Sequence, residues 1–269
     1  MIKLIALDLD GTLLPDDKKI TQATREVLIE AQQKGCTVAL ASARPTVGLV
    51  KERKALELDR YHGILIAYNG ARILDATTKT LLYERNMAPE IVTVLLRHLE
   101  AFPVAVMVDD NEAYYTTDPT AYKVAFERSV IGIPFKIVDN MAEAITFPIP
   151  KVLIVAPGPV LDQVMDPIKA PFADDLDFFR VGDFYIEVTI KDFSKAVGLT
   201  QLCQRRGIPM DQVVAFGDSQ NDQAMLETAG LGVAMCNADP EIQASADAVT
   251  RYSNNEDGVV RFIMDHHLI

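Results

Sequence analysis

The segment Asp8-Leu9-Asp10-Gly11-Thr12 directly follows an apolar run, residues 2–7, near the start of the chain. A short and almost uninterrupted apolar run is typical of a strand buried on both faces of a parallel sheet. Side chains two residues apart on a strand share a face, so Asp8 and Asp10 are expected to project together. Neighbouring carboxylates repel each other unless a cation or a shared proton compensates. Because ligands of open α/β sheets bind at the carboxyl ends of strands, we expect a functional site here.

An alternation of strands and helices continues from this segment. Helical spacing of apolar residues covers residues 21–34, and strands are expected at 37–41 and 64–67. The same alternation returns near the C-terminus, with helices and strands in turn at 196–206, 213–216, 222–229, 232–235 and 240–245. This rhythm is the signature of a doubly wound α/β sheet. We therefore expect residues 1–83 and 188–269 to form one Rossmann-like core domain with a parallel sheet.

The middle of the chain, residues 84–187, has a different pattern. Its strands come in near-adjacent pairs separated by short polar turns, namely 104–108 with 113–116 and 178–181 with 185–190. The pattern indicates an α+β unit inserted into the α/β domain. An insert that divides such a sheet is well placed to cover the crevice and to contact the part of a substrate that does not react. We therefore expect residues 84–187 to act as a specificity domain.

The composition limits the class of protein. The 269 residues are 49% hydrophobic and 24% charged, an ordinary balance for a soluble globular protein. Lys and Arg number 26 against 38 Asp and Glu, which gives a formal net charge of −12. Because an acidic surface repels nucleic acid and anionic membranes, neither is expected as a partner. Three scattered cysteines, with no signal peptide or long apolar run, favour a cytoplasmic protein.

A second acidic group, Gly217-Asp218-Ser219-Gln220-Asn221-Asp222, follows the strand expected at 213–216. Alone it could be a turn and a helix cap. At a second strand end of the same sheet, it supplies further carboxylates to the site of Asp8 and Asp10. A cluster of carboxylates of this kind suits Mg²⁺, a hard cation that also keeps water and substrate oxygens as ligands.

Two further elements would complete a phosphate site. Ser42-Ala43-Arg44 ends the strand expected at 37–41 and offers a hydroxyl and backbone N–H groups to phosphate oxygens. Lys195 opens a predicted helix, where the helix dipole disfavours a cation and a bound anion would favour it. Taken singly, Ser42 could be an ordinary cap and Lys195 a solvated surface residue.

The four elements, in this order, resemble the motifs of the haloacid dehalogenase superfamily of phosphohydrolases. The resemblance extends to the Cof-type subgroup, and especially to its bacterial sugar-phosphate phosphatases, through three more segments: Tyr68-Asn69-Gly70-Ala71, Gly232-Val233-Ala234-Met235 and Glu256-Asp257-Gly258-Val259. It implies a large cap domain between the second and third motifs, where the α+β insert lies.

The resemblance also implies roles. Asp8 would be the nucleophile that forms an aspartyl-phosphate, and Asp10 would protonate the leaving oxygen and then activate water. Mg²⁺ would be bound by Asp8, the backbone carbonyl of Asp10 and Asp218, while Asp222 would support the metal shell or Lys195. Phosphate would be held by five residues: Ser42, Lys195, Asn221 and the backbone amides of Leu9 and Ala43.

Two residues depart from the family pattern. Ala43 and Ala196 stand where the second and third motifs commonly have glycine. Alanine tolerates a left-handed backbone poorly, so such a conformation at residue 43 would be strained.

The sequence thus predicts a Mg²⁺-dependent hydrolase of a small, sugar-like phosphomonoester. A phosphomutase that shares the aspartyl-phosphate and a catalytically quiet small-molecule sensor remain as alternatives. Release of free phosphate without a bisphosphate requirement separates hydrolase from mutase, and the intact catalytic residues argue against the sensor. Neither the metabolite nor the oligomeric state can be named from the residue pattern.

Overall fold

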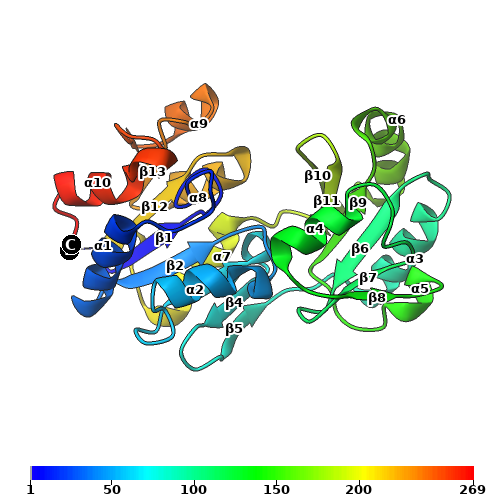
Figure 1. Ribbon diagram of the computed structural model, residues 1–269, viewed down its shortest axis with the longest axis horizontal. Coiled ribbons are helices and arrows are strands. Elements are labelled where there is room, and N and C mark those ends of the chain that lie inside the picture. Colours follow the sequence, from blue (N-terminus) through cyan, green and yellow to red (C-terminus); the bar gives the residue numbers. More distant parts are fainter. Residues whose placement is uncertain (1) are drawn as a thin grey trace. The chain divides into compact units, whose positions relative to one another are not determined.

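The computed structural model describes residues 2–269, and the chain divides into two compact units (Figure 1). The core unit comprises the residues up to Glu84 together with Ser194–Ile269, and the inserted unit comprises Arg85–Phe193. The second boundary therefore falls after Phe193 rather than after residue 187 as expected. The reason is strand β11 (Tyr185–Ile190), which pairs with a strand of the inserted unit on each side.

The core unit is built on an eight-stranded sheet with the order β14-β13-β12-β1-β2-β3-β4-β5. Its strands are β1 (Leu4–Leu7), β2 (Thr37–Ala41), β3 (Ile64–Ala67), β4 (Arg72–Asp75), β5 (Leu81–Glu84), β12 (Val213–Gly217), β13 (Leu231–Ala234) and β14 (Ala248–Val249). The strands from β14 to β3 pair in parallel, which confirms the predicted α/β class. The strands β4 and β5 pair antiparallel and extend the sheet beyond its predicted edge.

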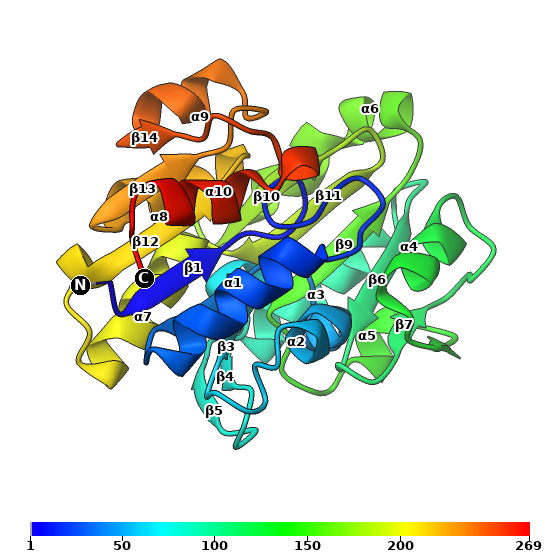
Figure 2. The same cartoon turned by 60° about the vertical axis from the view of Figure 1, so that its left-hand side comes forward.

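Helices cover both faces of this sheet. They are α1 (Gln22–Gln33), α2 (Val50–Ala55), α7 (Lys195–Arg206), α8 (Gln223–Thr228), α9 (Pro240–Ser245) and α10 (Gly258–Asp265), with short 3₁₀ turns η1 (Thr46–Leu49), η2 (Tyr68–Gly70), η4 (Met210–Gln212), η5 (Gln220–Asp222) and η6 (Asn254–Glu256). On one face Leu4 of β1 belongs to the same buried cluster as Leu199 of α7. On the other face the ring of Phe216 in β12 packs edge-on against Phe262 of α10, and Figure 2 shows α1 and α10 in front of the sheet.

The inserted unit has a sheet of its own, with the order β10-β11-β9-β6-β7-β8. Its elements are α3 (Pro89–Leu99), β6 (Ala105–Asp109), β7 (Tyr114–Thr116), α4 (Val124–Ile131), β8 (Phe135–Ile137), α5 (Met141–Ala144), β9 (Lys151–Val155), α6 (Gly158–Lys169), η3 (Ala170–Phe172), β10 (Leu176–Val181) and β11. The pairs β6–β7 and β10–β11 are antiparallel, as the paired apolar runs predict. Apolar side chains from one face of this sheet pack with α3 and α6 in a separate core, represented by Ile154, Leu95 and Leu161.

The centre of the core sheet decides where a ligand can bind. Strand β1 lies between β12 and β2, with Leu4–Leu7 opposite both Val213–Phe216 and Thr37–Leu40. From β1 the chain continues toward β2 on one side, and from β12 it continues toward β13 on the other. This divergence is a topological switch point, and in open α/β sheets ligands bind at the carboxyl ends of the strands at such a point. Within the described part of the chain, no helix combines the length and apolar character needed to cross a membrane.

Candidate active site

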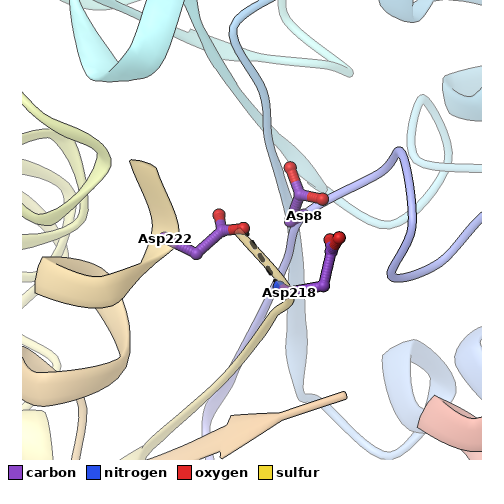
Figure 3. A group of neighbouring side chains, drawn as sticks. All are labelled: Asp8, Asp218 and Asp222. Carbon is purple, nitrogen blue, oxygen red and sulfur yellow. Dashed lines mark hydrogen bonds between the residues drawn. The ribbon is translucent and has the colours of Figure 1, made fainter. Parts of the chain in front are cut away.

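Three carboxylates meet where β1 and β12 end (Figure 3). Asp8 is the first residue after β1, and its backbone N–H donates to the carbonyl of Phe216 at 3.0 Å, which continues the ladder between the two strands. Asp218 and Asp222 come from the segment that follows β12. Each of the three residues offers a carboxylate oxygen, and these oxygens all lie within 4.8 Å of one another. Asp8 and Asp222 are buried, and Asp218 is half-buried.

Two glycines make room for these carboxylates. Gly11 has a φ of +88°, and a Cβ at this position would overlap with the carboxylate of Asp218. A Cβ at Gly217 would overlap in the same way with the side chain of Asp222. The hydroxyl of Thr12 donates to Oδ1 of Asp218 at 2.7 Å and orients it. Glycine is required at these two motif positions because the carboxylates occupy the space of a side chain.

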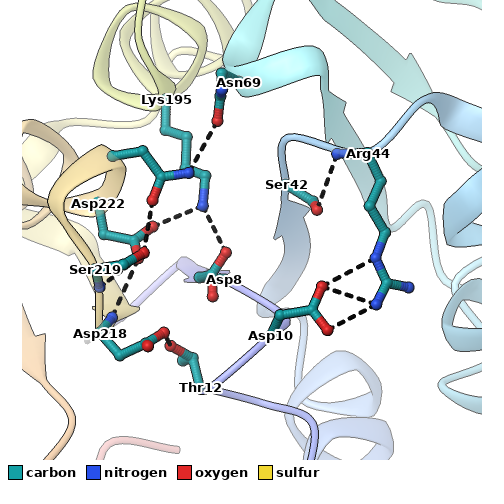
Figure 4. A network of polar contacts seen from close by, with 11 residues as sticks. Asp8, Asp10, Thr12, Ser42, Arg44, Asn69, Lys195, Asp218, Ser219 and Asp222 are labelled. Carbon is teal, nitrogen blue, oxygen red and sulfur yellow. Dashed lines mark hydrogen bonds and ion pairs between the residues drawn. The ribbon is translucent and has the colours of Figure 1, made fainter. Parts of the chain in front are cut away.

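Lys195 joins two members of the carboxylate group (Figure 4). It is the first residue of α7, and only 1% of its surface is exposed. Its Nζ donates to Oδ1 of Asp8 at 2.5 Å and to Oδ1 of Asp222 at 2.7 Å. The other oxygen of Asp222 accepts the backbone N–H groups of Asp218 and Ser219, both at 3.1 Å. Burial opposes the charge of Lys195, but Asp222 and Asp8 outweigh burial and raise its pKa above the usual range.

The charges of this cluster do not balance. Burial and the nearby charge of Asp222 raise the pKa of Asp8 to about 8, although Lys195 acts in the opposite direction. Burial also raises the pKa of Asp218 above its ordinary value. One ammonium cannot neutralise three carboxylates, and a hard divalent cation with oxygen ligands would supply the missing positive charge. The donor set therefore fits such a cation.

The carboxylate of Asp10 has separate partners and is not a member of the group of three. Nε and Nη2 of Arg44 donate to Oδ2 and Oδ1 of Asp10 at 3.0 and 2.7 Å, a two-pronged contact visible in Figure 4. Nζ of Lys18 lies 2.8 Å from Oδ1 of Asp10. Burial raises the pKa of Asp10, but Arg44 and Lys18 outweigh burial and hold the pKa below its usual range. Sequence reasoning missed these two partners of Asp10, although Arg44 lies within the strand-end segment that carries Ser42.

The carboxylates of Asp8 and Asp10, which were expected on one face of the strand, have different partners: Lys195 for Asp8 and Arg44 for Asp10. Strand β1 ends at Leu7, and the chain turns immediately afterwards. The N–H of Leu14 donates to the carbonyl of Leu9 at 2.8 Å within this turn. Asp10 therefore lies in the turn that follows β1, beyond the end of the strand.

The segment after β2 brings Ser42 to the same end of the sheet. Ser42 is buried, its N–H donates to the carbonyl of Ile66 at 2.9 Å, and its hydroxyl accepts the N–H of Arg44 at 3.2 Å. Within residues 2–269, the non-glycine residues with positive φ do not include Ala43. The methyl group of Ala43 therefore causes no left-handed strain, and Ala196 fits the regular backbone of α7.

Asn221, in η5, contacts a residue that the motif analysis did not place in the site. Its Nδ2 donates to Oδ1 of Asn69 at 3.1 Å. Asn69 belongs to η2, the turn after β3. The structure thus gathers the predicted residues at the carboxyl ends of β1, β2 and β12 and at the start of α7: Asp8, Leu9, Asp10, Ser42, Ala43, Lys195, Asp218, Asn221 and Asp222.

A parallel sheet with a carboxylate cluster and a buried lysine at its switch point defines a class of phosphate-processing hydrolases. Residues 5–263 match the family of haloacid dehalogenase-like hydrolases, and the chain belongs to this family. Family and fold class are therefore as predicted, and the chain is a phosphoric monoester hydrolase. Hydrolases of this family generally use a divalent metal, in agreement with the carboxylate cluster.

Individual relatives match over almost their whole length. YxeH of Bacillus subtilis is 33% identical over 272 residues, which cover 100% of this chain and 99% of YxeH. Its name assigns it provisionally as a phosphatase. The 5-amino-6-(5-phospho-D-ribitylamino)uracil phosphatase YcsE of the same organism is 30% identical, covering 97% of this chain and 94% of YcsE. The crystal structure of a haloacid dehalogenase-like hydrolase from Bacteroides thetaiotaomicron has a TM-score of 0.94 at 32% identity, covering 99% of this chain and 100% of that chain.

Proposed function

We propose that this protein is a Mg²⁺-dependent phosphatase of small phosphomonoesters that passes the phosphoryl group first to Asp8 and then to water. The observation that carries the proposal is the buried carboxylate of Asp8, hydrogen-bonded to Lys195 within a group of carboxylates at the sheet's switch point. Asp8, the backbone carbonyl of Asp10 and Asp218 would hold Mg²⁺, with Asp222 supporting this arrangement. When bound, the cation offsets the charge of the phosphate dianion and orients its oxygens.

The residues of this chain then have distinct tasks. A carboxylate oxygen of Asp8 attacks phosphorus, and the bond from phosphorus to the leaving oxygen breaks while Asp10 gives that oxygen a proton. Asp10, now a carboxylate, takes a proton from the water that attacks the aspartyl-phosphate, which releases orthophosphate and restores Asp8. The first half requires a protonated Asp10, which the contacts of Arg44 and Lys18 disfavour, and the second half uses the carboxylate form that these contacts favour. Lys195, Ser42 and Asn221 would hold the phosphoryl oxygens during both displacements.

The substrate proposed here is a phosphate on a small hydroxylated carbon chain, such as a sugar phosphate. The support is that YcsE is named for a substrate with its phosphate on a ribityl chain. We further propose that the inserted unit, which contains none of the four motifs, selects the substrate by contacting its non-reacting part.

The test is phosphate release from a panel of sugar and polyol monophosphates by wild type, Asp8→Asn and Asp10→Asn. Asp8→Asn should abolish turnover because an amide is no nucleophile, and Asp10→Asn should lower kcat by about 10² to 10⁴. Asp17→Asn is a matched control, because Asp17 is exposed and outside the site. EDTA should remove activity, Mg²⁺ should restore it, and Ca²⁺ should do so poorly because its larger shell is less strictly octahedral.

Three results would contradict the proposal. The first is wild-type kcat in folded Asp8→Asn, and the second is full activity in excess EDTA. The third is inversion of configuration at a chiral phosphate, because two successive in-line displacements retain the configuration. A requirement for a bisphosphate in place of free phosphate release would indicate a phosphomutase.

A further inference from the structure

The turn η2 has an unusual backbone at the edge of the site. Tyr68, Asn69 and Gly70 follow β3 with φ values of 51°, 54° and 103°. Positive φ is common for glycine and tolerated by asparagine, but for a bulky residue such as tyrosine it is an outlier. Strained conformations of this kind persist only where the surrounding structure enforces them, and they cluster at functional sites.

The backbone of η2 is tied to the segment that carries Ser42. The N–H of Tyr68 donates to the carbonyl of Arg44 at 3.0 Å, and the N–H of Asn69 donates to the carbonyl of Ser42 at 2.9 Å. The side chain of Tyr68 is 2% exposed, so packing fixes this residue as well. The turn and the segment after β2 are therefore held as one rigid piece.

The same turn touches the start of α7. A Cβ at Gly70 would lie 2.5 Å from the carbonyl oxygen of Ser194, and a Cβ at Gly198 would lie 2.7 Å from the Cα of Gly70. The two backbones are thus in direct contact, next to Lys195. This close approach fixes the position of η2 relative to Lys195.

The side chain of Asn69 extends this framework to Asn221 through a hydrogen bond. Oδ1 of Asn69 accepts a hydrogen bond from Nδ2 of Asn221, and Oδ1 of Asn221 accepts one from the hydroxyl of Ser219 at 2.7 Å. If the amide of Asn221 turned over, its oxygen would face the oxygen of Asn69. Asn69 therefore selects one orientation of that amide, in which the amide nitrogen has a second N–H to donate.

We propose that Asn69 is a positioning residue, which holds the amide of Asn221 in the orientation that donates to the phosphate, and that the strained turn serves to aim Asn69. The inference rests on the proposed function, in which Asn221 contacts phosphate. Without the oxygen of Asn69, the amide of Asn221 rotates and its donor is lost for part of the time. Binding of the phosphate group weakens as a result.

The experiment uses Asn69→Gly, because glycine keeps the left-handed backbone and removes only the side chain. The full-length enzyme is assayed with Mg²⁺ and p-nitrophenyl phosphate, with inorganic phosphate as a competitive inhibitor. KM and the phosphate inhibition constant should rise about three- to tenfold, the effect of one hydrogen bond, while kcat and the melting temperature change little. His62→Gly is the control, since His62 has a φ of 55° just before β3, at the opposite end of that strand.

A double-mutant cycle separates positioning from a general structural effect. Asn221→Ala alone should raise KM, and Asn69→Gly in that background should raise it no further. Wild-type KM in Asn69→Gly, or effects of the two substitutions that multiply, would overturn the inference. If Asn221→Ala has wild-type KM, the phosphate role of Asn221 in the proposed function fails as well. Wild-type KM in Asn69→Gly beside an impaired Asn221→Ala overturns the inference alone.

Discussion

Replacing Lys195 by methionine should destabilise the metal-free protein strongly. Methionine nearly matches lysine in length but removes the ammonium that donates to Asp8 and Asp222 at 2.5 and 2.7 Å. Removing one partner of a buried ion pair costs about 3 to 5 kcal/mol, because the remaining charge is left without compensation. At about 2 to 4 °C for each kcal/mol, the melting temperature should fall by about 6 to 20 °C.

Scanning calorimetry in EDTA and in Mg²⁺ measures this loss. In Mg²⁺ the loss should shrink, because the cation replaces part of the missing positive charge. Lys151→Met is a matched control from the inserted unit, where the half-buried Lys151 pairs with the buried Glu187 at 2.8 Å. Its loss of stability should not depend on Mg²⁺.

A second variant makes the reasoning refutable. Lys195→Met with Asp222→Asn removes one stranded charge, so it should melt at a higher temperature than Lys195→Met alone in EDTA, while both stay inactive. The reasoning is refuted if Lys195→Met has the same melting temperature as the wild type in EDTA. It is also refuted if the melting temperature of the double variant is no higher than that of Lys195→Met.

Two further predictions concern the acid–base groups. Arg44→Ala should lower kcat by about 10²-fold with a smaller change in KM, because Asp10 loses the two-pronged contact that orients it. Steady-state kinetics measure this, with Arg25→Ala as a surface control. An unchanged kcat in Arg44→Ala contradicts the prediction. The pKa of Asp8 is raised to about 8 in the folded protein, so the folded state holds a proton that the unfolded state has lost. The metal-free protein therefore loses stability as pH rises from about 4 toward 8. Below pH 8, Mg²⁺ must displace this proton in order to bind. Calorimetric Mg²⁺ affinity should therefore rise about tenfold from pH 6 to pH 7 in wild type but not in Asp8→Asn, and a flat wild-type profile contradicts the reasoning.

Much of the core sheet could be predicted because its strands are buried on both faces. The apolar runs of β1 and β12 have few polar interruptions, and the helix after each strand is marked by its own periodicity. Strands β4 and β5 could not be predicted in this way, because neither has the continuous apolar run of a strand buried on both faces. Leu81–Glu84 of β5 is only partly buried and shows neither a continuous apolar run nor a clear alternation.

Some residues of the candidate site could likewise be predicted from the sequence, and others could not. Asp8 and Asp218 could be expected to meet because the ends of adjacent parallel strands share one edge of the sheet. The pairing of Asp10 with Arg44 could not be expected, because it depends on how the chain turns after strand β1 ends. Asn69 carried only a weak signal, the Asn-Gly pair that tolerates a left-handed backbone.

The pairing of β1 with β12 has a consequence for the order in which the protein is made. Until the ribosome has released residues 213–217, one edge of the apolar strand β1 has no neighbour, while the inserted unit can already complete its own sheet. A nascent chain in this state exposes an unpaired, apolar strand edge, which is prone to aggregation. It also carries Asp8 without Asp218 and Asp222, so it cannot form the cluster of three carboxylates. Assembly of this cluster is therefore a late event in biogenesis, because it requires the two distant segments of the core unit to pair.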